Sequence, residues 1–141
     1  MRVWLALAFL CAFSTLANAQ AVTCSGSPAL SPTSITFTAS PDHNATQPVT
    51  GVVLLTKYAG AIFKSGDSTP TVTVDFGKPT PNGSNAIALA NVIPQTLAKD
   101  TVFCLRLDAV GPGGTGSTAP VPFDFPTAVQ APRPAPAVSL Q

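Results

Sequence analysis

Cysteine is the residue type with the clearest chemistry in this chain of 141 residues. Cys24 and Cys104 are about 80 residues apart, so they lack the C-x-x-C spacing of a redox site. The third cysteine, Cys11, lies in an N-terminal apolar run that we expect to be removed, and the other two with a single histidine fall short of the usual zinc ligand set. We therefore expect a Cys24–Cys104 disulfide, formed in an oxidising compartment, and no metal site. Closing a loop of this length stabilises a fold by roughly 4 kcal/mol.

The remaining polar residues do not form a catalytic pattern. His43 is the only histidine and lies in the turn-forming sequence Asp42-His43-Asn44, where we expect it to be exposed to solvent. The six acidic residues are all Asp and are scattered singly, and no G-x-S-x-G motif is present. We expect neither an enzyme nor a bound cofactor.

The N-terminus has the three parts of a secretory signal peptide. Arg2 precedes an eleven-residue apolar run, residues 3–13, and the run leads to Ala17-Asn18-Ala19, an A-x-A cleavage pattern. The apolar run is too short to span a bilayer, and Thr23 before Cys24 is a poor lipoprotein signal. The sequence therefore predicts a signal peptide at 1–19 and a secreted, periplasmic or cell-surface protein, with no membrane span in the mature chain.

Composition favours strands over helices. Only 9% of residues are charged, the net charge is +1, and the chain contains 15 Pro and 10 Gly. So few Lys and Arg argue against a nucleic-acid partner, because phosphate contacts need them in number. We expect one domain over residues 20–126, followed by a Pro/Ala-rich, extended tail over 127–141.

Alternation of apolar and polar residues indicates short strands separated by turns. In residues 101–110, the clearest case, it places Phe103, Leu105 and Leu107 toward the core and Cys104 away from it. Residues 119–125 alternate too, with Val121 facing inward, but their two prolines predict an edge strand. The predicted strands are 33–40, 49–57, 61–64, 71–76, 85–93, 101–110 and 119–125. About seven short strands predict an all-β, two-sheet sandwich.

Residues 31–125 resemble a fibronectin type III domain, a variant of the immunoglobulin-like sandwich. Residues 34–41 look like the family's second strand, 48–54 like the start of its third strand, and 103–111 like its "Y-x-V-x-V-x-A-V-N" run. Ala39 and Phe103 depart from the family, which usually has Trp and Tyr at these places. The resemblance implies a binding and spacing module.

A glycine-rich segment offers a candidate contact for a partner. Residues 111–118 lack the Lys of a phosphate-binding loop and are interpreted as a flexible hairpin loop. The candidate contact residues are Gly111, Pro112, Gly113, Gly114, Thr115 and Gly116.

Two sites could carry a modification, because Asn44 and Asn82 begin N-glycosylation sequons.

The leading functional hypothesis is a non-catalytic binding or adhesion module. It would recognise an extracellular protein or glycan through loops or a sheet edge. The alternative is a structural subunit of an extracellular fibre or surface layer, a homo-oligomer that assembles by strand addition.

We predict that the exported protein begins at Gln20, because the A-x-A pattern directly precedes this residue. Intact mass spectrometry of the exported chain tests the prediction. A mass that includes residues 1–19 would contradict it.

Overall fold

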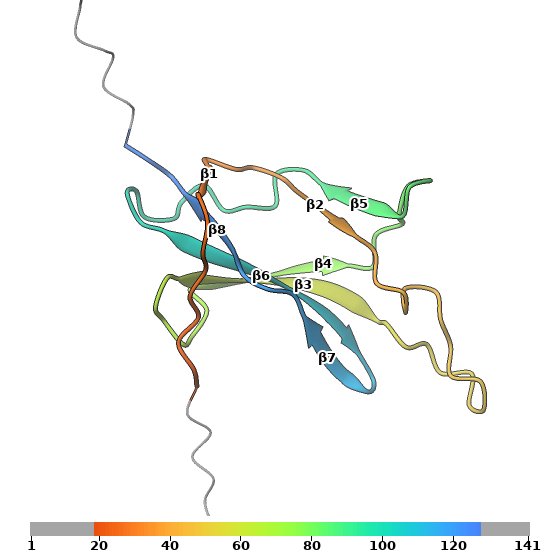
Figure 1. Ribbon diagram of the computed structural model, residues 1–141. Helices are drawn as coiled ribbons and strands as arrows, with labels where there is room; N and C mark the ends of the chain where they lie inside the picture. The colour runs from red at the N-terminus through yellow and green to blue at the C-terminus, as the bar shows by residue number, and fades with distance from the viewer. Residues whose placement is uncertain (1–18, 128–141) are drawn as a thin grey trace, which may run out of the picture.

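The computed structural model describes residues 19–127, so most of the predicted signal peptide and the tail after Thr127 lie outside the described residues. Eight strands and no helix form within this range (Figure 1). The strands are β1 (Ala29–Leu30), β2 (Ile35–Thr38), β3 (Lys57–Lys64), β4 (Val72–Gly77), β5 (Ala86–Leu89), β6 (Phe103–Gly111), β7 (Gly114–Ser117) and β8 (Val121–Asp124).

The strands form two sheets of unequal width. The larger, six-stranded sheet has the order β1-β8-β6-β3-β4, and β7 pairs with β6 beside this path. The smaller sheet contains only β2 and β5, which are antiparallel. This all-β arrangement is compatible with a β-sandwich, which is the coarse architecture that the sequence predicts.

The antiparallel pair of β3 and β6 is the centre of the larger sheet. It runs in unbroken register from Lys57 opposite Val110 to Lys64 opposite Phe103. Alternate residues of the pair face the smaller sheet and contribute to two buried clusters. One cluster contains Ile62, Ile93, Leu97, Phe103, Phe123 and Phe125, and the other contains Ala39, Leu55, Tyr58 and Ile87.

Tyr58 explains why the expectation for His43 is wrong. His43 is only 6% exposed, and its ring stacks on Tyr58 with 5.8 Å between centroids. The Tyr58 hydroxyl lies 3.1 Å from His43 Nδ1 and accepts a hydrogen bond of 2.9 Å from the backbone N–H of Ser40. A buried hydroxyl needs such partners, so the turn folds onto the core instead of into solvent.

The predicted strand over 49–57 is wrong, and with it the likeness of residues 48–54 to a third strand. These residues form a projecting loop, because Gly51 takes a positive φ of 67° and its N–H bonds back to Gln47 O. Val49 is 92% exposed as a result. The central strand instead begins at Lys57 and includes the short strand that the sequence predicts over 61–64.

Two further strand predictions need correction. The glycine-rich segment is not a flexible loop, because β6 extends to Gly111 and Gly114 pairs with it at the start of β7. Only Pro112 and Gly113 form the turn. Strand β8 is not at the sheet edge either: β6 pairs with one side of it, and the two residues of β1 pair with the other.

Gly111 permits a close approach between two backbone segments. A Cβ atom at this position would lie 1.9 Å from Leu54 O, whereas one at Gly116 would meet nothing within 4 Å. Without that atom, Thr56 reaches Val110 O with its N–H and its hydroxyl, both at 2.8 Å. The absence of a side chain at Gly111 therefore lets the projecting loop come close enough to hydrogen-bond with the end of β6.

We predict that Gly111→Ala lowers the free energy of unfolding by about 1–3 kcal/mol or more, because backbone must move to admit the methyl group. Gly116→Ala is the matched control and is expected to change it by less than about 0.5 kcal/mol. Urea unfolding followed by circular dichroism measures both. Equal stability of the two variants would contradict the close approach.

Candidate functional site

A disulfide fastens the N-terminal segment to the outer face of the larger sheet. Cys24 and Cys104 are bonded, with 5.7 Å between their Cα atoms. Cys104 faces away from the core, as the alternation predicts, yet it is fully buried because the segment covers it. Val22 exchanges two backbone hydrogen bonds with the turn at Gly66 and Asp67, of 2.9 and 2.8 Å. Figure 1 shows the segment crossing the strands before it reaches β1.

The same outer face carries a polar cluster in the middle of the sheet. Asp108 is 8% exposed and accepts hydrogen bonds from Arg106 Nε at 2.8 Å and Ser117 Oγ at 2.6 Å. The Arg106 guanidinium lies over the ring of Phe63, 5.1 Å from its centroid. The Asp108 carboxylate is therefore fixed by hydrogen bonds, and we interpret the cluster as a structural link between β6 and β7.

The opposite face of the larger sheet is covered incompletely. An apolar groove of about 320 Å³ runs between β2 and the segment that leads into β8. The sandwich is open here because the smaller sheet ends at β2 (Figure 1). The main apolar residues of the groove are Ile35, Phe37, Leu105, Leu107, Val121 and Phe123.

Residues that the sequence assigns to the core are exposed in this groove. Val121 has the inward position that alternation predicts, but it is 59% exposed. Leu105 and Leu107 belong to the central strand of the larger sheet, and both are only half-buried. Since β6 is paired on both sides, this exposure comes from the missing cover above it and not from a position at the sheet edge.

The free edge of β2 borders the groove. The N–H of Ala39 donates to Asn85 O, and Thr33 O accepts from Val92, so odd-numbered residues direct their backbone groups toward β5 and the chain beyond it. Backbone direction alternates along a strand. The N–H and C=O groups of Ser34, Thr36 and Thr38 therefore point away from β5, where no other strand of residues 19–127 pairs with them.

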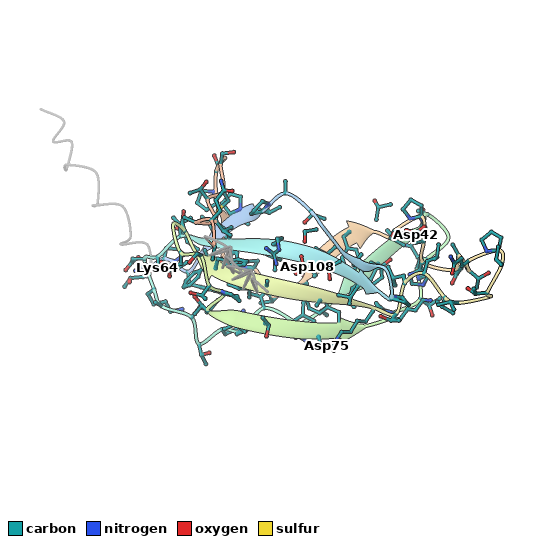
Figure 2. The ribbon with its side chains drawn as sticks, turned by 90° about the horizontal axis from the view of Figure 1, so that it is seen from below. Asp42, Lys64, Asp75 and Asp108 are labelled. Atoms are coloured by element: carbon teal, nitrogen blue, oxygen red, sulfur yellow. A yellow bond between two sulfur atoms is a disulfide. The ribbon has the colours of Figure 1, made fainter. Side chains whose placement is uncertain are left out.

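The predicted contact loop lies at one end of the sandwich. Gly111 and residues 113–116 surround a shallow hollow of about 400 Å³ together with Ser40, Asp42 and Leu54. The neighbouring loop exposes Val49, Val52 and Val53. The structure thus gathers the glycine-rich hairpin and an apolar loop at the same end, which Asp42 marks in Figure 2.

The charged residues do not gather into a reactive site. The labelled side chains of Asp42, Lys64, Asp75 and Asp108 are well separated in Figure 2. Lys57 donates a hydrogen bond to Asp75, which holds the pKa of that exposed carboxyl below its ordinary value. Within residues 19–127, no three His, Cys, Asp or Glu side chains are placed to hold a metal ion, and no helix is long and apolar enough to cross a bilayer.

Asp100 holds the last described residue. Its carboxylate accepts hydrogen bonds from the N–H of Thr127, at 2.8 Å, and from the Thr127 hydroxyl. These bonds lower the pKa of the Asp100 carboxyl. The N–H of Asp100 in turn donates to Phe125 O, at 3.0 Å. The start of the predicted tail is therefore fixed at the end of the sandwich that contains Phe125.

Comparison with known proteins adds no family to this description. No family model matches the chain, and neither the curated proteins nor the solved structures give a match. The groove and the free edge of β2 are therefore interpreted from their own geometry.

We predict that replacing both Cys24 and Cys104 by Ala lowers the free energy of unfolding by roughly 4 kcal/mol, because an 80-residue loop is then no longer closed in the unfolded chain. Urea unfolding measures the loss. Non-reducing peptide mapping of the unmodified protein is expected to show one internal Cys24–Cys104 link. Two free thiols, or a link between chains, would contradict the fold of the N-terminal segment.

Proposed function

We propose that this chain is an exported, non-catalytic binding module of the immunoglobulin-like, fibronectin type III-like kind, which binds an extended polypeptide along the free edge of β2. The disulfide and the signal sequence support the exported location. The observation that carries the binding role is the groove beside β2, where apolar residues of the central strand β6 are left half-buried.

A polypeptide strand matches both parts of this surface. Its backbone would pair with the N–H and C=O groups of Ser34, Thr36 and Thr38 at the free edge of β2. Every second side chain would enter the groove and cover Leu105 and Leu107. Strand addition of this kind derives affinity from main-chain hydrogen bonds and specificity from pockets for alternate side chains.

The character of the groove favours a polypeptide over a glycan. Its lining is mainly apolar, so sugar hydroxyls placed there would give up hydrogen bonds to water without replacement. The glycine-rich hairpin at 111–116 carries no charged or aromatic side chain. We therefore place the main contact at the sheet edge and not at the loop that the sequence suggested.

The proposal is tested by panning random ten-residue peptides on the exported chain, immobilised at low density. We expect enriched peptides with apolar residues at every second position. Val121→Lys should weaken their binding by about tenfold or more, because a lysine here places a charge in the groove.

Val49→Lys is the matched control, because it introduces the same side chain at a surface position outside the groove. It should leave binding unchanged. Absence of enrichment, or peptides that bind both lysine variants equally well, would contradict a strand-binding groove.

A further inference from the structure

The C-terminal tail has the sequence of a one-sided strand. From residue 132 to residue 140 every even position is apolar: Pro132, Pro134, Pro136, Val138 and Leu140. The odd positions between them are small or polar. A strand built from this segment therefore has one apolar face, and its prolines all fall on that face.

The prolines also determine which side of the strand can pair. A proline has no N–H, and backbone groups of alternate residues point to the same side of a strand. The side that belongs to positions 132, 134 and 136 therefore lacks donors. The side that belongs to Arg133 and Ala135 keeps them, so the segment can pair along one side only. This is what a strand at the edge of a sheet requires.

We propose that residues 132–140 of one copy bind in the groove of a second copy and pair with its β2. This inference rests on the proposed function and names the partner of the same site. The five apolar side chains would face Leu105, Leu107 and Val121. The odd-numbered backbone groups would bond to Ser34, Thr36 and Thr38 at the free edge.

Stereochemistry requires the tail to run antiparallel to β2. In antiparallel pairs, residues directly opposite each other have their side chains on the same face of the sheet. Thr36 and Thr38 direct their backbone groups to the free edge and their side chains outward. Their partners then also point outward, and the inward residues of the added strand make no bond to β2. Proline is therefore permitted at the inward positions.

A parallel tail would not meet both conditions. In parallel pairing each residue of β2 bonds to the two residues that flank the one opposite it. For Thr36 those flanking residues would face inward, toward the groove. If the apolar face of the tail enters the groove, the flanking residues are prolines. Because proline has no N–H, the C=O groups at the free edge of β2 would then have no donor.

Direction favours a second copy over the chain's own tail as the occupant. Asp100 holds Thr127 beside Phe125. Phe125 belongs to the core cluster against which Ile35 packs, so the tail starts at the Ile35 end of β2 (Figure 1). A tail running directly from there along its own β2 would be parallel to it. To pair antiparallel, it would first have to pass the Thr38 end of β2 and then turn back. A second copy is free of this restriction.

Each copy then carries one donor tail and one acceptor groove. Such contacts are heterologous and join copies head to tail into an open chain when the rotation between them does not close a ring.

Two full-length variants test the tail and the groove separately. Ala135→Pro removes a donor that faces β2 and blocks the tail, and Thr36→Pro removes a donor at the free edge and blocks the groove. Ala128→Pro is the matched control, because it introduces the same substitution into the tail but outside residues 132–140.

Sedimentation velocity over a range of concentrations tests the proposal with the exported chain. We expect concentration-dependent polymers for the unmodified chain and for Ala128→Pro. At a concentration that just polymerises the unmodified chain, each blocked variant alone should stay monomeric, and an equal mixture of the two should form dimers. The block should weaken association by about tenfold, from one lost hydrogen bond. Val121→Lys serves as a second groove variant if Thr36→Pro unfolds.

The proposal is overturned if the unmodified chain stays monomeric at millimolar concentration, or if Ala135→Pro assembles as well as Ala128→Pro. Protection of the β2 edge in a monomer would place the chain's own tail in the groove and would also overturn it. Each result leaves the panning experiment unaffected: random peptides that bind the groove while copies do not associate would retain the strand-binding function and reject only this partner.

Discussion

The unequal width of the two sheets is the constraint on which the rest of this structure depends. Two strands, β2 and β5, lie over a sheet of six. They cover Tyr58, while Ile93 and Leu97 of the chain that follows β5 pack with Ile62 and Phe103, and all of these residues are buried. The two strands do not reach far enough to cover the side on which β8 lies. Burial of apolar surface stabilises the fold only where cover exists, so the same mismatch creates the core and leaves the groove.

The two faces of the larger sheet are completed in different ways. On the outer face, the N-terminal segment is bonded through Cys24 and buries Cys104 completely. On the inner face, a short connection between β1 and β2 crosses from one sheet to the other, and β2 remains unpaired on one side within the described residues. The disulfide thus completes the outer face from within the chain, whereas the inner face beside β2 stays open within the described residues.

Alternation in the sequence was sufficient to place β4, β6 and the inward residues of β2, because each has a clear period of two. It failed where local patterns compete. The apolar run before Lys57 is strand-like in composition, but Gly51 turns it into a loop. His43 follows a turn signal, but the single tyrosine of the chain holds it in the core. The groove could not be predicted, because no local pattern states how many strands the smaller sheet contains. Val121 has an inward position in the alternation, and it is exposed because the smaller sheet does not cover it.

The central claim is that β2 has one paired side and one open side. Amide hydrogen exchange by NMR tests it directly in the Ala135→Pro chain at low concentration. Phe37 and Ala39 direct their N–H groups toward β5, while Thr36 and Thr38 direct theirs to the free edge. The account predicts that the two threonine amides exchange at least about tenfold faster than their neighbours. Equal protection of all four amides would show that β2 is already paired on both sides and would contradict the account.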